Sequence, residues 1–481
     1  MKYAFFTYSG EGLAVAYKLL KEGNEVVVGM LNEHPKIPDI TPEAKKRRLK
    51  LFDGLLEKHD AQELVNKLKK ENPKDWFIFC DFNYLYPIAE QLKNKGFKGL
   101  LPSEEDFDLE NDRESGKDFV FNHYKVFSIQ EVREFQTIDE AKKFLSEQEK
   151  VYGIKGYNPD APTFFPASNN PKIALIELTD IMDSYKKEYE SEGFILEEKI
   201  EDLIETTPEI IVQDGEILGM NINLELKPIG NGNLGYLSGD SASFIMWIEK
   251  NSLAWNKLYE LFFQPALSKI IRPEELVIWD AGVMYSPSRN KFYFSEYAPM
   301  RPAYNAFFDE LSTFDKVSTY FEKIINKEPL FDKNVKPFGC GIRVFNLLPD
   351  KKFKEMYQEN ILVYGNPDDK NLWFFDIYKR GNNLYTVGME KDVAVVTASG
   401  DDWKEAFKEI DEKLSSGEYL VFPSMYYRKA FDILNNLYQN NLKDRYNFIC
   451  EFLELNAPKI SSVNEEETDE NTLLNKILSR L

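Results

Sequence analysis

The sequence contains few of the residues that build metal sites, disulfide frameworks or membrane spans. Its 481 residues include only three histidines and three cysteines, and Cys80, Cys340 and Cys450 lie far apart. This spacing excludes a CxxC motif or a Cys/His zinc site, and it is typical of a protein in a reducing compartment. No run of about 18 apolar residues occurs, and the first residues lack the layout of a signal peptide. We therefore expect a cytoplasmic protein that has no membrane partner.

The charge balance is strongly acidic. Lys and Arg total 60 against 81 Asp and Glu, a formal net charge of −21. A field of this sign repels phosphate backbones, so we expect small-molecule substrates, no nucleic-acid partner, and a monomer or homodimer. Glycine is scarce as well, at 25 residues, or about 5% where about 7% is usual.

The first hundred residues alternate strands with helices. An apolar strand is predicted over 2–8, a turn over 9–12, a helix over 13–20 and a second strand over 25–30. Further strands are predicted at 76–80 and 99–101, with a helix near 88–92 between them. This order predicts a doubly wound α/β domain over residues 1–102.

The remaining chain divides by composition. Residues 103–114 hold seven acids in twelve positions and predict a solvated acidic linker, taken as 103–116. A body is expected over 117–330, with short strands at 151–154, 173–178 and 194–197, and then hairpins whose turns are Asp214-Gly215 and Ser288 to Asn290. An α/β domain is expected over 331–430, and a helical, partly disordered tail over 431–481. The fold class is therefore α/β with an α+β body.

Two glycines and two lysines are candidates for binding an anion. Gly10 and Gly12 lie between a strand and a helix, where backbone N–H groups favour phosphate, although such turns often serve only tight packing. Lys155 ends a short strand, and Lys117 opens a predicted helix; each of them alone is also compatible with an ordinary surface lysine. Glu197 follows an apolar run, at a strand end able to present backbone groups to a purine.

Two carboxylates are candidates for binding a metal ion. Glu296 ends an apolar strand, and Asp280 lies on the predicted hairpin partner of that strand. Together they offer two hard oxygen ligands of the kind that Mg²⁺ prefers. The alternative is a pair of exposed strand carboxylates with no ligand.

Taken in order, these segments resemble the ATP-grasp ligases, and among them the glycinamide ribonucleotide synthetases. The resemblance extends from residue 1 to about residue 430. Besides the first strand-helix-strand unit, it rests on segments 115–119 (SGKDF), 152–155 (YGIK), 195–200 (ILEEKI), 211–215 (IVQDG), 281–284 (AGVM), 395–402 (VVTASGDD) and 426–429 (YYRK).

The resemblance implies a site for ATP and Mg²⁺ (or Mn²⁺) and the activation of a carboxylate to an acyl phosphate that an amine then attacks. It implies that Lys117 and Lys155 contact phosphates, that Glu197 and the Ile200 backbone contact adenine, and that Glu205 or Glu201 reaches the ribose. It further implies Glu296, with Asp280, as metal ligands, Lys227 beside Lys155 in the catalytic cleft, and Gly10 and Gly12 near a substrate phosphate.

The chain departs from the family pattern at the loops where the family is glycine-rich. Segment 156–166 contains three prolines in place of a mobile flap, and we expect it to be stiff. Segment 227–235 has asparagines where the family has aspartates. Ala298 replaces a metal-binding asparagine, so Asp280 or Asn305 would have to substitute.

Three hypotheses follow. The first is an active ligase, either joining glycine to phosphoribosylamine in purine synthesis or using another amine. The second is a catalytically inactive ATP-grasp scaffold that still binds nucleotide. The third, a nicotinamide-dependent oxidoreductase, is disfavoured because Val15 occupies the position of the third glycine of a dinucleotide motif.

Overall fold

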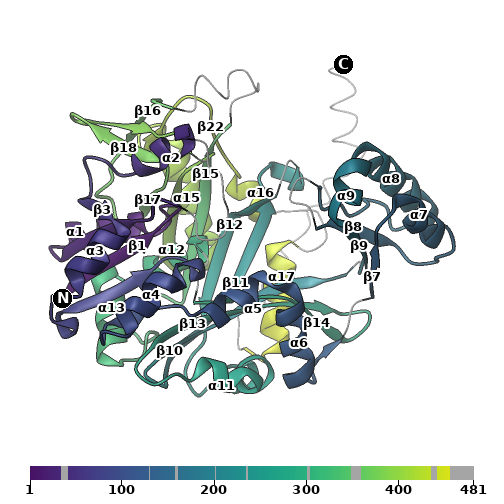
Figure 1. The fold of residues 1–481 in the computed structure, drawn as a ribbon, viewed down its shortest axis with the longest axis horizontal. Helices are drawn as coiled ribbons and strands as arrows, with labels where there is room; N and C mark the ends of the chain where they lie inside the picture. Colours follow the sequence, from purple (N-terminus) through teal and green to yellow (C-terminus); the bar gives the residue numbers. More distant parts are fainter. Residues whose placement is uncertain are drawn as a thin grey trace.

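A computed structural model of the chain describes residues 1–33, 42–128, 131–157, 161–200, 202–234, 237–300, 304–347, 359–389, 391–434 and 441–455. Most of its strands join one mixed sheet of fifteen strands, and a four-stranded and a three-stranded sheet accompany it (Figure 1). Within these ranges no helix combines the length and the apolar character needed to cross a bilayer. All three cysteines are buried and free of disulfides.

The N-terminal region is the predicted doubly wound α/β domain. Its parallel strands pair in the order β3-β2-β1-β4-β5. The elements are β1 (Lys2–Thr7), α1 (Leu13–Lys21), β2 (Glu25–Met30), α2 (Pro42–Leu49), β3 (Lys58–Asp60), α3 (Ala61–Leu68), η1 (Pro73–Asp75), β4 (Trp76–Cys80), η2 (Asn83–Leu85), α4 (Tyr86–Lys93) and β5 (Lys98–Leu100). Alternate side chains of β1 enter different cores: Tyr3 and Phe5 pack with α1, and Ala4 and Phe6 pack with α3 and α4. Helices therefore cover both faces.

The acidic segment after this domain is helical, in contrast to the predicted solvated crossing. It forms α5 (Glu104–Asn111) and leads into α6 (Arg113–His123). Ser103 and Asp106 form a capping box at the start of α5. Asp106 is fully buried and accepts hydrogen bonds from Arg272. Clustered acids in the first turn favour a helix N-terminus. One of them, the buried Asp106, has a partner that lies far away in the sequence.

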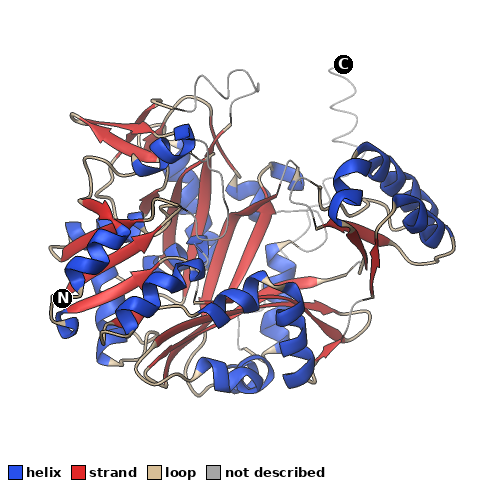
Figure 2. Cartoon of the chain, in the orientation of Figure 1, coloured by secondary structure: helices blue, strands red, loops and turns tan. Residues whose placement is uncertain are grey.

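A small module follows, with helices on one side of a three-stranded antiparallel sheet ordered β7-β9-β8 (Figures 1 and 2). Its elements are β7 (Val132–Phe135), α7 (Ile138–Ser146), β8 (Tyr152–Gly156), α8 (Pro171–Ser184), α9 (Lys186–Glu192) and β9 (Phe194–Glu198). The strand predicted at 173–178 is wrong, because these residues belong to α8. Asn170 caps that helix, Pro171 occupies its first turn, and Ala174, Leu178 and Met182 lie four residues apart on its buried face.

Long antiparallel strands form the central body, in the order β12-β11-β10-β13-β14. They are β10 (Ile204–Gln213), β11 (Glu216–Pro228), β12 (Leu237–Trp247), β13 (Leu276–Ser286) and β14 (Lys291–Pro299), and the short strand β6 (Phe127–Ser128) pairs with β14. The segments that connect these strands contain the short helices η3 (Asn231–Asn233), α10 (Leu253–Leu258), η4 (Tyr259–Phe263), η5 (Gln264–Ala266) and α11 (Leu267–Ile270). Asp214 and Gly215 both have positive φ, 51° and 77°, as the predicted tight hairpin requires.

The C-terminal region extends the same sheet. Strand β15 (Phe338–Asn346) pairs with β12 on one side and with β20 (Asp392–Gly400) on the other. Its remaining elements are α12 (Tyr304–Ser312), α13 (Val317–Asn326), β16 (Leu362–Gly365), β17 (Leu372–Phe374), β18 (Ile377–Arg380), β19 (Asn383–Thr386), α15 (Trp403–Ser415), β21 (Leu420–Val421), β22 (Met425–Tyr427), α16 (Ala430–Leu434) and α17 (Leu442–Phe452). Because β5 also pairs with β13, the sheet connects the N-terminal, central and C-terminal regions.

Candidate functional site

Two neighbouring cavities lie where these regions meet. We call the larger one, of about 770 Å³, the lysine cavity, and the smaller one, of about 510 Å³, the acidic cavity; Glu110 and Glu296 line both. The lysine cavity is lined by Leu109, Glu110, Gly116, Lys117, Val120, Phe121, Ser128, Glu131, Val132, Lys155, Phe165, Ile195, Glu197, Lys199, Ile200, Leu203, Met284, Tyr293, Phe294, Ser295 and Glu296. Its walls therefore come from α5, α6, the small module and the hairpin of β13 and β14.

Five residues singled out from the sequence share the lysine cavity: Lys117, Lys155, Glu197, Ile200 and Glu296. They come from α6, β8, β9, the segment after β9, and β14. Lys117 lies in the middle of α6, so the expectation that it opens a helix is wrong: the helix begins at Arg113. The fold thus gathers residues that are up to 179 positions apart in the sequence, since 296 − 117 = 179.

Lys155 and Glu197 are the most closely associated of the five. On the antiparallel strands β8 and β9, Lys155 is opposite Ile195 and Glu197 is opposite Gly153, so the two side chains are diagonal neighbours on one face. The Lys155 ammonium forms an ion pair with the Glu197 carboxylate. It also lies 5.5 Å from the centre of the Phe165 ring. Before any ligand binds, the Lys155 ammonium therefore already has partners within the protein.

The proline-containing segment that replaces the expected flap is held in place, as far as its described residues 161–166 show. Phe164 and Ile154 exchange two backbone hydrogen bonds, 2.8 and 2.9 Å, so the segment pairs with β8. The Tyr189 hydroxyl donates to the Pro162 carbonyl, and the Lys199 ammonium donates to the Pro166 carbonyl at 2.6 Å. Phe165 thereby becomes a fixed part of the lysine cavity wall.

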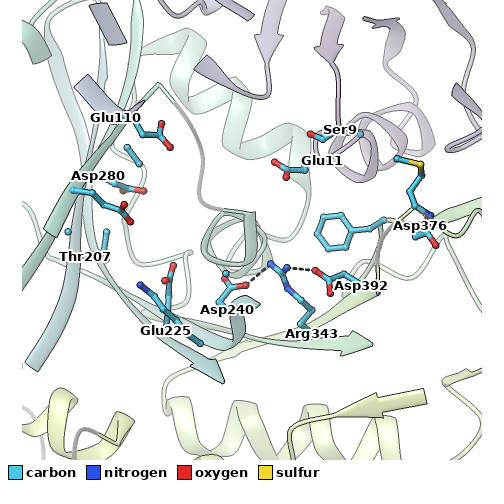
Figure 3. A pocket seen from close by; sticks show the side chains of 18 of the residues that line it. Ser9, Glu11, Glu110, Thr207, Glu225, Asp240, Asp280, Arg343, Asp376 and Asp392 are labelled. Carbon is cyan, nitrogen blue, oxygen red and sulfur yellow. Dashed lines mark hydrogen bonds and ion pairs between the residues drawn. The ribbon is translucent and has the colours of Figure 1, made fainter. Parts of the chain in front are cut away.

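The acidic cavity is lined by Ser9, Gly10, Glu11, Leu51, Glu110, Glu205, Thr207, Glu225, Lys227, Gly239, Asp240, Asp280, Gly282, Glu296, Ala298, Arg343, Phe375, Asp376, Met389 and Asp392. Nine of these side chains are carboxylic acids, and two, Lys227 and Arg343, are cations. Figure 3 shows the Arg343 guanidinium between Asp240 and Asp392, each at 2.5 Å. Although burial opposes the charged form, these two carboxylates raise the pKa of Arg343.

Glu205 and Lys227 form the second ion pair of the acidic cavity. Their carboxylate and ammonium are 2.8 Å apart on β10 and β11. Although burial favours the neutral acid, Lys227 and Arg445 hold the pKa of Glu205 below its usual range. The ribose contact expected of Glu205 is not favoured by its position, because Glu205 lines the acidic cavity and not the lysine cavity. Glu201, the other residue considered for that contact, lies outside the described residues.

Glu225 lies on the same strand as Lys227 and has a different electrostatic environment. Burial, followed by repulsion from the Asp240 carboxylate, raises the pKa of Glu225 to about 7. Its carboxylate accepts a hydrogen bond of 2.8 Å from the Asn223 amide. Glu225 therefore titrates near neutral pH at the wall of the cavity.

The two expected metal ligands have different surroundings. Glu296 is exposed at the boundary of both cavities, whereas Asp280 is buried opposite Glu209 of β10. Burial, together with repulsion from Glu209, raises the pKa of Asp280 well above its usual range. Asn305, the other substitute considered for the missing asparagine, accepts a hydrogen bond from Arg343 at 3.1 Å and lines neither cavity.

Mg²⁺ usually binds to one or two protein carboxylates together with substrate phosphates. Glu296, with Asp280 nearby on the acidic cavity wall, matches this donor chemistry. In the parts of the chain that the structure describes, no three His, Cys, Asp or Glu side chains are arranged to hold a metal ion by themselves. The residues thus fit a metal ion that phosphate oxygens help to bind.

The two N-terminal glycines have backbone N–H groups that are already bonded within the protein. The Gly10 N–H donates to the Thr7 hydroxyl, and the Gly12 N–H donates to the Asp81 carboxylate, both at 2.8 Å. Gly10 lines the acidic cavity and Gly12 lines neither cavity. The turn therefore offers neither of these two amides to a phosphate, and the tight packing considered for it is the use that the structure shows.

The asparagine-containing loop after Lys227 binds to the C-terminal region. Asn233 accepts a hydrogen bond of 2.6 Å from the Arg428 guanidinium, and Asn231 accepts one of 3.0 Å from the Lys429 N–H. The Asp432 carboxylate accepts one from the Gly232 N–H. The asparagines thus act as acceptors for the segment 426–429, which explains their presence without a role in binding substrate.

Sequence reasoning missed Arg343, Asp240, Asp392, Glu225 and Glu110 as cavity residues. Arg343 offers a usable signal, because it is a single charge inside the otherwise apolar strand β15, and charges in such positions are generally paired. The acids offer no comparable signal among 81 acidic residues.

The overall arrangement is a known one: the chain has the ATP-grasp fold. A phosphoribosylamine-glycine ligase from Thermotoga maritima superposes with a TM-score of 0.58 and 15% identity, over 89% of this chain and all of that one. A phosphoribosylglycinamide synthetase from Anaerococcus prevotii gives 0.51 and 14%, over 88% and 99% of the two chains. The biotin carboxylase domain of Hydrogenobacter thermophilus 2-oxoglutarate carboxylase, in complex with MgADP and bicarbonate, gives 0.54 and 12%, over 93% and 98%.

No protein-family model matches the sequence, and no curated protein matches it. The similarity to known proteins therefore lies in the fold. This fold confirms the ATP-grasp resemblance drawn from the sequence.

Proposed function

We propose that the protein is an ATP-dependent ligase that activates a carboxylate and joins it to an amine. The observation that carries this proposal is the gathering of Lys117, Lys155, Glu197, Ile200 and Glu296 around one cavity of about 770 Å³ in an ATP-grasp fold. Cavities of roughly 300 to 1,000 Å³ accommodate ligands of nucleotide size.

In this proposal the lysine cavity binds ATP. Lys117 and Lys155 attract the phosphates, the Glu197 carboxylate accepts from the adenine amino group, and the Ile200 backbone meets the adenine edge. Lys155 would exchange its ion pair with Glu197 for a phosphate. Glu296 and Asp280 would hold Mg²⁺, which when bound offsets the negative charge of the phosphates.

The chemistry proceeds in two steps. A carboxylate oxygen of the first substrate attacks the γ-phosphorus of ATP, the bond to the β-phosphate oxygen breaks, and ADP leaves. A neutral amine then attacks the acyl carbon, inorganic phosphate leaves, and one amine proton passes to that phosphate. Lys155 stabilises charge on the transferred group through its positive charge, while Lys227 keeps its ion pair with Glu205 in the acidic cavity. The fixed segment 161–166 limits water at the acyl phosphate.

The specific reaction named by two structural neighbours is the joining of glycine to phosphoribosylamine, as in purine biosynthesis. It is one candidate within the proposed function. The acidic lining of the second cavity favours the alternative, a diverged ligase with a different amine.

Carboxylate activation can be tested without knowing the amine. Purified protein, ATP, Mg²⁺ and hydroxylamine are mixed with single carboxylic acids, glycine among them, and hydroxamate and ADP are measured. Hydroxamate formation that requires both ATP and one particular acid supports the ligase. ATP binding with no hydroxamate from any acid contradicts catalysis.

A catalytically inactive nucleotide-binding scaffold is the second candidate. The fixed proline-containing segment and the Lys155 ion pair favour it. Calorimetry separates the two hypotheses, because a ligase should bind ATP more tightly with Mg²⁺ than without it, and an inactive scaffold should show no such difference.

A further inference from the structure

We propose that the acidic cavity binds the acceptor amine, and that this acceptor is a diamine: an alkyl chain with two amino groups and no phosphate. The inference rests on the proposed ligase function and specifies the substrate class of the second cavity. The position of that cavity supports it, because Glu110 and Glu296 line both cavities, so a molecule in the acidic cavity is adjacent to the proposed nucleotide.

The walls of the acidic cavity carry more acids than cations. Nine carboxylic acids and two cations line the cavity, and seven acids remain when Asp280 and Glu296, the proposed Mg²⁺ ligands, are set aside. Both cations are already neutralised: Lys227 by Glu205 at 2.8 Å, and Arg343 by Asp240 and Asp392 at 2.5 Å each. A phosphate entering the cavity would have to displace these carboxylates, whereas an ammonium group would meet acceptors on several sides.

The backbone beside this cavity does not favour a phosphate. The turn before α1 is the element of this cavity that would bind a phosphate through N–H groups. The Gly10 and Gly12 N–H groups donate instead to Thr7 and Asp81. The phosphate site expected there is thus occupied by the protein's own acceptors.

The walls of the acidic cavity also combine acids with an apolar surface. Glu11 and Glu225 reach the cavity from two separate elements, the turn before α1 and β11. The same walls carry Leu51, Phe375 and Met389, an apolar surface that suits a methylene chain between two charged ends.

A diamine also suits the ligase chemistry. One amino group, in its neutral form, attacks the acyl carbon as described above, and the other stays protonated against the carboxylates. The product is a monoamide that retains one positive charge.

The test is a calorimetric titration of 1,4-diaminobutane and, separately, ribose 5-phosphate into the full chain at fixed Mg²⁺ and pH 8. We expect the diamine to bind, and to bind more weakly as the NaCl concentration is raised. Ribose 5-phosphate should give no binding signal. Glu225→Gln should weaken diamine binding at least fivefold. The matched control, Glu409→Gln, changes an exposed acid paired with Lys413 on α15 and should leave binding unchanged.

Either of two results would overturn the inference: ribose 5-phosphate binding as tightly as the diamine, or no diamine binding by the wild-type protein. Both comparisons use the unmodified chain, so they stand even if Glu225→Gln fails to fold. A parallel ATP titration separates this inference from the ligase proposal. ATP binding and hydroxamate formation without diamine binding refute the acceptor class alone, whereas absence of ATP binding refutes the ligase.

Discussion

Lys155 and Glu197 form an ion pair across the adjacent strands β8 and β9, in the wall of the lysine cavity. The pair places the lysine that we propose for phosphate binding beside the acid that we propose for adenine binding. It also means that nucleotide binding has to compete with a contact within the protein.

Replacing Lys155 should weaken nucleotide binding. We expect Lys155→Met to raise the dissociation constant of ATP roughly tenfold or more, because a hydrogen bond to a charged group contributes about 1.5 to 3 kcal/mol. Calorimetry with Mg²⁺ and a non-hydrolysed ATP analogue measures this. Lys142→Met, which removes an ion pair with Asp183 on the outer helices of the small module, is the control and should bind as the wild type does. An unchanged affinity in Lys155→Met would remove this residue from the phosphate site.

Replacing Glu296 should remove the effect of magnesium. In Glu296→Ala we expect the affinity for ATP to be the same with and without Mg²⁺, since its exposed carboxylate is the proposed metal ligand that lines the lysine cavity. The comparison needs four titrations, two proteins with and without the ion. A Mg²⁺ dependence that persists in the variant would show that other residues hold the ion.

Diamine binding should depend on pH through Glu225. Its pKa is raised to about 7 by burial and by Asp240, and the ionised form attracts a cation. The ionised fraction rises from about a tenth at pH 6 to about nine tenths at pH 8, so affinity should rise by roughly tenfold over that range. In Glu225→Gln the same titrations should be nearly flat. A wild-type affinity that falls as pH rises would contradict this assignment.

The raised pKa of Glu225 should also make the stability of the fold decrease as the pH rises, whereas the affinity for a diamine increases. A carboxyl group whose pKa is higher in the folded than in the unfolded state contributes its full stabilisation at pH values below the unfolded pKa, near 4.5. That contribution is lost as the pH rises through the folded pKa of about 7. We therefore expect the pH dependence of urea unfolding between pH 5 and 8 to be shallower in Glu225→Gln than in the wild type. Identical slopes would show that other buried acids, such as Asp280 and Glu209, dominate this range.

The buried pair of Asp106 and Arg272 should be important for stability. Arg272→Met leaves the fully buried Asp106 without its cation, and breaking such a pair costs about 3 to 5 kcal/mol in free energy of unfolding. Urea unfolding measures the loss. The control is Lys98→Met, whose exposed contact with Glu274 spans 3.9 Å; it should change stability by less than about 1 kcal/mol. A loss in Arg272→Met that is no greater than in the control would show that α5 does not depend on this contact.

The sequence predicted the elements whose patterns are local. Strands β1, β2, β4 and β5 and helices α1 and α4 of the first domain, the Asp214-Gly215 hairpin and the gathering of Lys117, Lys155, Glu197 and Glu296 follow from periodicity, from turn chemistry or from the resemblance. Strand β3 and helix α3 were not predicted. The stretch 173–178 was mistaken for a strand, because a short apolar run has no clear period until its cap, Asn170, is taken into account.

Long-range pairing could not be predicted. The acids of α5 looked like a solvated linker because the partner of Asp106 lies 166 residues later, at Arg272. In the same way, the asparagines of the loop after Lys227 have their donors at Arg428 and Lys429. Such contacts depend on tertiary structure, which single-sequence patterns do not encode.

Helix α17 extends the functional unit beyond the residues that line the cavities. Buried Arg445 on this helix donates to the backbone carbonyls of Glu205 and Glu225, at 2.9 and 2.8 Å, on the strands that carry the acids of the acidic cavity. A chain cut after Leu434 would keep every lining residue of both cavities and yet leave two strand carbonyls without their donor. The shortest segment that preserves the site in its observed form therefore ends after α17, more than fifty residues beyond Asp392, the last residue to line it.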